Sequence, residues 1–276
     1  MSRLKLAVSV CGLLLLGVTS WKAASLQHVF LRLSIQSPEL AMVQDGTTYR
    51  TVLVVGQSNA ANHGSWRAHA PDPHRSWYAG QAYALRDPLP GCSGIGGSPW
   101  ARLALLDSQK SKQNWLIACA AVGSSSMADW QPGGALFREA SENLRQLNAF
   151  GLRPDWIVLH QGETDAFVGT DQKTYGRQLR RLVAELHVLA PQALIVLCQT
   201  SIHGRHVLPN PAVRAAQADV WRELPYVWAG VDTDSFPPHL RASDGVHFND
   251  RGLQTFAALI RSAMLYPSDV ARVYTP

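Results

Sequence analysis

The sequence of 276 residues is poor in cysteine and in charge, and no local cluster offsets either scarcity. Charged residues make up 16% of the chain, the formal net charge is +5, and the lysines and arginines are scattered. This pattern argues against a nucleic-acid partner, which would need a basic face interleaved with aromatics. The chain also has no repeat and no break in composition, so one large domain with an ordinary core is expected.

An uncharged, mostly apolar run lies near the N-terminus, from Leu6 to Val18. Arg3 and Lys5 precede it and small residues at 23–25 follow it, which is the order of a secretory signal. The run is shorter than the roughly 20 residues that a spanning helix needs. A cleaved signal over residues 1–25 is therefore favoured over an uncleaved anchor. It predicts export to the periplasm or outside the cell, with membrane contact only through an uncleaved N-terminal segment.

The cysteines predict no disulfide framework. Cys11 lies inside the signal, which leaves the odd set of Cys92, Cys119 and Cys198, and their spacing fits no zinc site. Cys119 and Cys198 lie in apolar runs and are expected to be small buried side chains.

The remaining chain predicts a stem or edge segment at 26–48, where alternation from Val29 to Ile35 indicates a short strand, and an α/β domain at 49–276. Continuous apolar runs indicate strands that are buried on both faces, at Thr51–Val55, Trp115–Cys119, Trp156–His160, Leu194–Cys198 and Tyr226–Trp228. Helical patterns separate them, at about 99–106, 136–147, 172–189, 211–223 and 251–265, with Asn210 before the fourth and Asn249 and Asp250 as N-cap candidates of the fifth. The alternation predicts a three-layer α/β/α sandwich around a five-stranded, mainly parallel sheet.

In such a sheet the active site lies at the carboxyl ends of the strands. The first predicted strand ends in Gly56, Gln57, Ser58 and Asn59. A serine hydroxyl becomes a nucleophile when a base removes its proton and donors stabilise the oxyanion. On this motif alone, Ser58 could equally be a turn residue that caps the next helix.

The loops after the next two predicted strands offer donors. Gly123 opens the sequence GSSS, where a backbone N–H can approach a substrate oxygen, although a simple turn is an alternative. His160 begins the sequence HQGETD, in which the neutral amide of Gln161 suits an oxyanion hole. The alternative for this loop is a network of bonds that orders it, to which Asp165 would belong.

Asp244 and His247 lie three residues apart, directly before the last predicted helix. On one short loop the carboxylate can bond imidazole Nδ1 and leave Nε2 free to accept the serine proton. The combination of a serine, two donor loops and an Asp/His pair, each after a strand, predicts a Ser-His-Asp triad.

These motifs resemble the blocks of the SGNH hydrolases. GQSN, the Gly123 loop, HQGETD and DGVHF are most similar to the sialate O-acetylesterase-like and carbohydrate-esterase branch, which includes acetylxylan esterases, over about residues 50–262. The resemblance implies an SGNH, flavodoxin-like fold with Ser58 as nucleophile, His247 as base and Asp244 as its orienting acid. It also implies an oxyanion hole of the Ser58 N–H, the Gly123 N–H and the Gln161 amide. A serine esterase that removes small acyl groups, above all acetyl, from carbohydrate hydroxyls is expected, with no metal or cofactor.

The sequence departs from the branch at Ala60, at the GSSS loop and at Thr164, which takes the place of an oxyanion-hole Asn in more distant relatives. These departures bear on the substrate more than on the reaction. Glu163 either orients the histidine or braces its loop. The other supporting residues expected are Gln57, Asn59 and Trp130.

Tryptophans could stack on a sugar ring, and Trp130, beyond the Gly123 loop, is favoured over Trp66, Trp77 and Trp100. Two rival functions stay open. One is a metallohydrolase that uses His63, His69 and His74, or His203 and His206, although no familiar zinc spacing is present. The other is a carbohydrate-binding protein that keeps the fold without catalysis.

Overall fold

The computed structural model of this chain describes residues 47–110, 113–204 and 208–266. The predicted signal at 1–25 and the predicted strand from Val29 to Ile35 lie outside the described residues. Within the described ranges, no helix is both long enough and apolar enough to cross a membrane.

A seven-stranded sheet forms the centre of the domain. Its strands are β1 (Tyr49–Gly56), β2 (Arg75–Tyr78), β3 (Gln81–Ala84), β4 (Asn114–Ala121), β5 (Trp156–His160), β6 (Leu194–Gln199) and β7 (Val227–Asp232). They lie in the order β3-β2-β4-β1-β5-β6-β7. Every neighbouring pair is parallel except β2 and β3, which form an antiparallel hairpin. The five predicted strands are all present.

The predicted number of five strands is wrong, because the hairpin of β2 and β3 adds two strands at one edge of the sheet. Each strand of the hairpin has only four residues, and Arg75, Ser76 and Gln81 interrupt any apolar run. The turn between them has positive φ at Ala79 (49°) and Gly80 (77°), which matches the twist of a tight hairpin. These residues are strands because β2 pairs with β4 and β3 pairs with β2, and not because of their own hydrophobicity.

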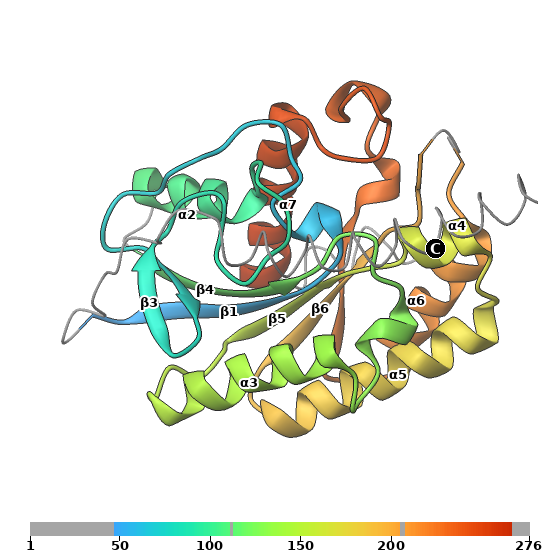
Figure 1. Cartoon of the computed structure of the whole chain (residues 1–276), viewed down its shortest axis with the longest axis horizontal. Helices are drawn as coiled ribbons and strands as arrows, with labels where there is room; N and C mark the ends of the chain where they lie inside the picture. The colour runs from blue at the N-terminus through green and yellow to red at the C-terminus, as the bar shows by residue number, and fades with distance from the viewer. Residues whose placement is uncertain (1–46, 111–112, 205–207, 267–276) are drawn as a thin grey trace, which may run out of the picture. The chain divides into compact units, whose positions relative to one another are not determined.

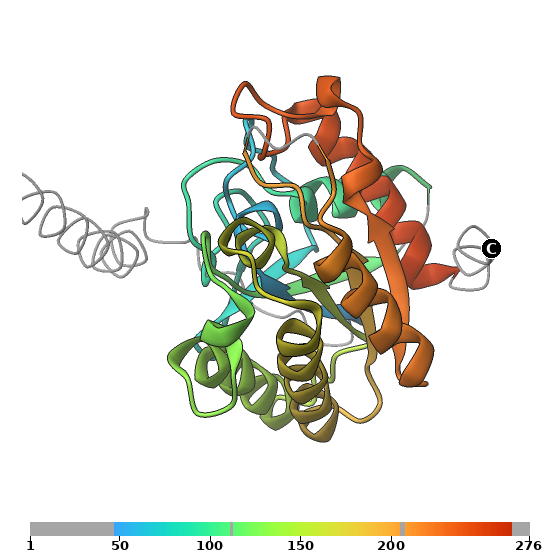
Figure 2. The same cartoon turned by 90° about the vertical axis from the view of Figure 1, so that its right-hand side faces the viewer.

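Helices cover both faces of the sheet and complete three layers (Figures 1 and 2). On one face lie α2 (Pro99–Lys110) and α7 (Asp250–Leu265), and on the other lie α3 (Ala135–Ala149), α5 (Gln172–Leu189) and α6 (Pro211–Glu223). These are the five predicted helices. A short helix that was not predicted, α4 (Glu163–Val168), lies at the carboxyl edge after β5.

Alternate side chains of β1 enter the two halves of the core. Val52 and Val54 pack with α2 and α7, whereas Leu53 and Val55 pack with α3 and α5. All four side chains are fully buried. Each contributes roughly 1.5–3 kcal/mol by leaving water, which is why the strand is apolar at consecutive positions.

A disulfide joins Cys92 to Cys119, with their Cα atoms 5.7 Å apart, while Cys198 is free and buried. The prediction of no disulfide, and of Cys119 as an unpaired side chain, is therefore wrong. Three cysteines can form one disulfide and leave one thiol free, and only the fold shows which two of the three lie close together. The bond ties the loop before α2 to the end of β4.

Loss of this disulfide should lower the free energy of unfolding by about 2–4 kcal/mol, because the closed loop restricts the unfolded chain. The partners are 27 residues apart. The double variant Cys92→Ala, Cys119→Ala should unfold at lower urea concentration than the oxidised protein, and reductant should shift only the latter. Equal midpoints for the variant and the oxidised protein would contradict this expectation.

Candidate active site

Ser58 lies directly after β1, in the 3-10 helix η1 (Ser58–Ala60), and is almost completely buried. The turn depends on Gly56, where φ is 151° and a Cβ would lie 2.0 Å from the carbonyl oxygen of His160. Gln57 N–H donates to the same oxygen at 3.1 Å, so β1 and β5 stay joined up to the serine. The N–H groups at the start of η1 have no partner within the helix and are available to an oxyanion.

Asp244 and His247 form the predicted pair. His247 Nδ1 lies 2.6 Å from Asp244 Oδ2, and Asp244 Oδ1 accepts the N–H groups of Val246 (2.8 Å) and His247 (3.0 Å). Burial alone would raise the pKa of Asp244, but the bonds from the ring and the two amides outweigh it and lower that pKa. The carboxylate therefore stays ionised and holds the ring through Nδ1, which leaves Nε2 for the substrate side.

Asn59 joins the loop of Ser58 to the loop of His247. Its Nδ2 donates to Val246 O at 3.2 Å, across 187 residues of sequence, and to Glu163 Oε1 at 3.1 Å. The amide of Ser65 adds a second bond, to Phe248 O at 3.3 Å. The fold thus brings together the two loops that the sequence predicts to share one site.

Gly123 follows β4, and its N–H donates to the Ser93 hydroxyl at 2.7 Å. Ser93 Oγ lies 3.0 Å from His63 Nε2, and the His63 ring stacks on the His247 ring with centroids 5.4 Å apart. A Cβ at residue 123 would lie 2.9 Å from His63 Nε2, so a larger residue there would displace the His63 ring. Sequence reasoning missed Ser93 and considered His63 only as a metal ligand, because nothing local links the sequence GCSG to the site.

The structure contradicts the oxyanion role predicted for Gln161. Its Nε2 donates to Ser125 O at 3.1 Å and to Asp165 Oδ2 at 2.6 Å, and both side chains are buried. These two bonds use both amide hydrogens. Tyr175 OH donates to Gln161 O at 2.7 Å and fixes the residue further. Gln161 and Asp165 therefore belong to the loop-ordering network that was the alternative reading.

Glu163 braces the loop and does not hold the histidine, since its carboxylate bonds Asn59 while Asp244 bonds His247. Burial raises the pKa of Glu163 to about 7. Burial also lowers the pKa of His160 to about 3, and His160 Nδ1 lies 3.6 Å from Glu163 Oε1. Gln57 supports the same helix start, with Oε1 accepting Thr164 N–H at 3.1 Å.

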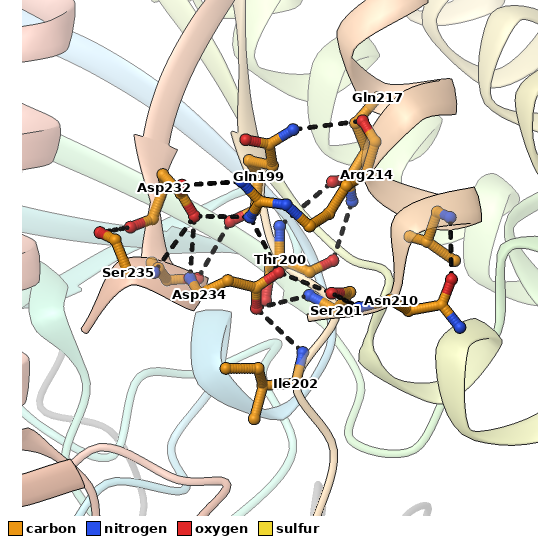
Figure 3. Close-up of polar contacts among 12 residues, drawn as sticks. Gln199, Thr200, Ser201, Ile202, Asn210, Arg214, Gln217, Asp232, Asp234 and Ser235 are labelled. Atoms are coloured by element: carbon orange, nitrogen blue, oxygen red, sulfur yellow. Dashed lines mark hydrogen bonds and ion pairs between the residues drawn. The ribbon is translucent and has the colours of Figure 1, made fainter. Parts of the chain in front are cut away.

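A second polar cluster fixes the carboxyl ends of β6 and β7 (Figure 3). Arg214 forms two bonds to Asp232, at 2.8 and 2.9 Å, and one to Asp234 at 3.0 Å. Asp234 accepts the N–H and hydroxyl of Ser201, and Gln217 connects Thr200 O to Gln161 O. Residues 213–217 and 231–233 supply part of this scaffold, which supports the site.

The expectation that Trp130 stacks on a sugar is wrong. Trp130 is fully buried and donates to Ser125 Oγ at 2.9 Å. Trp77 and Trp100 are also buried, whereas the Trp66 side chain is 70% exposed. A buried indole has no open face for a ligand, so of the four candidates only Trp66 can contact one.

Two of the histidines proposed as metal ligands have other partners. His74 Nδ1 accepts the N–H of Trp115 inside the core, and His63 stacks on His247. His206 lies outside the described residues. In the ranges that the structure covers, no group of three or more His, Cys, Asp or Glu side chains could hold a metal ion.

A serine after the first strand and an Asp/His pair before the last helix, at the carboxyl edge of a parallel α/β sheet, define the class of SGNH-type hydrolases. Residues 48–266 match the family described as carbohydrate esterase, sialic acid-specific acetylesterase, and the chain belongs to this family. It is therefore a carboxylic ester hydrolase. No curated protein sequence matches it.

Solved structures share the fold at low sequence identity. A protein from Arabidopsis thaliana has a TM-score of 0.65 and 18% identity, over 79% of this chain and 98% of that one. NanS has a TM-score of 0.54 and 14% identity, over 86% of this chain and 100% of that one. A family 3 carbohydrate esterase from Clostridium thermocellum has a TM-score of 0.53 and 13% identity, over 83% of this chain and 100% of that one. Similarity at this level shows the fold alone.

Glu163→Gln should remove a pH-dependent penalty on stability. The pKa of Glu163, about 7 in the folded protein, exceeds its ordinary value of 4.5. The folded state therefore holds an extra proton between these values, and wild-type stability falls as pH rises through that window. The full shift corresponds to roughly 3 kcal/mol. Gln keeps the acceptor for Asn59 and mimics the neutral carboxyl.

Urea unfolding of both proteins at pH 5 and pH 8 measures this effect. We expect the free energy of unfolding of the variant, relative to that of the wild type, to be higher at pH 8 than at pH 5. The lowered pKa of His160 acts with the opposite sign below its ordinary value in both proteins, so the quantity compared is the difference between the two pH profiles. Parallel pH profiles would show that Glu163 is ionised in the folded protein.

Proposed function

We propose that this protein is a serine esterase that removes acetyl groups from carbohydrate hydroxyls through an acyl-enzyme. One observation carries the proposal: the His247–Asp244 pair, bonded at 2.6 Å, lies on a loop that Asn59 ties to the Ser58 turn. This contact supports the proposal that a nucleophile, a base and an orienting acid share one edge of the sheet. Membership of a carbohydrate-esterase family supports the substrate class.

In the first half of the reaction, His247 Nε2 removes the Ser58 proton and Oγ attacks the ester carbonyl carbon. The carbonyl oxygen becomes an oxyanion, which the Ser58 N–H stabilises. The carbon–oxygen bond to the sugar then breaks, and the imidazolium returns its proton to the sugar oxygen. In the second half, His247 deprotonates a water whose oxygen attacks the acyl carbon. The bond from that carbon to Ser58 Oγ then breaks, the imidazolium returns its proton to Oγ, and acetic acid leaves.

We also propose that the protein is exported. The sequence of residues 1–25 has the order of a secretory signal. The Cys92–Cys119 disulfide supports the same proposal, because such bonds form and persist in oxidising compartments. Detection of the protein outside the cytoplasm, with a new N-terminus near residue 25, would test it.

Ser58→Ala should abolish acetate release from a panel of acetylated xylan, sialic acid and simple sugars. Removal of a triad nucleophile lowers turnover by roughly a thousandfold or more. Acetate is measured directly, and a serine-reactive phosphonate should label the wild type at one site per chain and the variant at none. Ser141→Ala is a matched control, because this buried serine donates to Phe137 O inside α3.

Full activity in Ser58→Ala would refute the serine mechanism. A wild-type protein that binds acetylated sugar yet neither releases acetate nor takes up the phosphonate would be the carbohydrate-binding protein without catalysis. Loss of activity in the presence of a chelator would instead revive the metallohydrolase.

Asp244→Asn should lower kcat by roughly 100- to 10,000-fold, because the amide no longer stabilises the imidazolium or its tautomer. Asn keeps an Oδ1 acceptor for the amides of Val246 and His247, so the loop should remain folded. Steady-state kinetics and thermal unfolding distinguish the two effects. A wild-type kcat would remove Asp244 from the triad.

A further inference from the structure

Ser93 lies between the two loops that carry Ser58 and Gly123. Its backbone N–H donates to Ala121 O at 2.9 Å, and its carbonyl accepts the N–H of Asn62 at 2.9 Å. Its neighbour Cys92 forms the disulfide with Cys119 at the end of β4. Three links thus fix one serine, which is almost fully buried, at the carboxyl ends of β1 and β4.

Asn62, two residues after η1, also holds the loop of Ser93 in place. Its Oδ1 accepts the N–H of Leu89 at 2.8 Å, and its Nδ2 donates to Leu89 O at 2.9 Å and Cys92 O at 3.3 Å. The loop around Ser93 is therefore held by a buried amide as well as by a covalent bond. A hydroxyl that is fixed before substrate arrives needs no reorganisation during the reaction.

The Ser93 hydroxyl occupies the hydrogen-bonding position of the Gly123 N–H, 2.7 Å from that nitrogen. This is the place that the oxyanion would take if Gly123 acted on it directly. A hydroxyl has two acceptor positions and one hydrogen. With the proton of His63 on Nε2, 3.0 Å away, Gly123 and His63 fill both acceptor positions. The hydrogen of Ser93 is then left for a third partner.

We propose that Ser93 is a second catalytic serine of the esterase, which donates its hydroxyl hydrogen to the ester carbonyl oxygen as that oxygen becomes an oxyanion. The Gly123 N–H and the His63 ring act through Ser93, because two donors polarise the hydroxyl and strengthen the bond that it donates. Ser93 fills the role that Gln161 cannot fill with both amide hydrogens in use. The inference rests on the proposed esterase function and deepens it.

Ser93→Ala tests the proposal. Loss of one oxyanion donor should lower kcat by about 100- to 1,000-fold, with little change in KM, on a chromogenic acetyl ester and on an acetylated sugar. Ser141→Ala, the same change in a buried serine of α3, should keep wild-type kinetics. Thermal unfolding verifies that both variants are folded. A kcat within threefold of wild type, or above it, would overturn the proposal, because the hydroxyl would then only block the Gly123 N–H.

His63→Phe provides a second, independent test. Phenylalanine keeps a ring against His247 but removes the nitrogen that bonds Ser93, so kcat should fall about tenfold. The double variant should be no slower than Ser93→Ala alone, because both changes act on one hydroxyl. If Ser93→Ala does not fold, His63→Phe decides, and an unchanged kcat would overturn the proposal.

Ser58→Ala distinguishes failure of the serine mechanism from failure of the role proposed for Ser93. If it is inactive while Ser93→Ala and His63→Phe keep wild-type kcat, the serine esterase stands and the role of Ser93 fails. If Ser58→Ala remains active, the serine mechanism fails, and the role of Ser93 fails with it.

Discussion

The site depends on the hydrogen bonds that the side-chain amide of Asn59 donates. It donates to Val246 O and to Glu163 Oε1, and so joins the loop after β1, the loop after β5 and the loop of the Asp/His pair. The strands β1 and β5 pair up to Gly56 and His160, but the loop of the Asp/His pair lies beyond this pairing. Arg241 supports the same carbonyl through a bond of 2.7 Å to Val246 O, which fixes the loop from the other side. The position of His247 relative to Ser58 follows from these side-chain bonds and not from the sheet alone.

Buried polar groups surround this contact, and several of them bond partners that lie far away in sequence, whereas Glu163 Oε2 and His160 Nδ1 have no hydrogen-bond partner. Gln161 bonds Asp165 and Ser125, and Tyr175 and Gln217 both donate to its backbone oxygen. An unpaired buried polar group costs about 1–3 kcal/mol, so each bond of Gln161 stabilises its loop. The network links the carboxyl ends of β5 and β6 and gives the catalytic loops a rigid base.

The other half of the site is held covalently. The Cys92–Cys119 disulfide and the Asn62 amide place the loop of Ser93 against the end of β4, where Gly123 begins its turn. The site thus has two supports: the polar network under Glu163 and Gln161, and the disulfide loop beside Gly123. His63 connects them, since it bonds Ser93 and stacks on His247.

The sequence by itself determined the layers, because burial on both faces makes β1, β4, β5 and β6 apolar at consecutive positions, and a one-sided stripe marks each long helix. It also determined the Asp244–His247 pair, since three residues of one loop suffice to close that bond. Only the tertiary structure decided that Cys92 pairs with Cys119, that Trp130 is buried, that Gln161 turns into the network, and that Ser93 meets Gly123. Each of these depends on segments far apart in the chain, whose contacts no local pattern encodes.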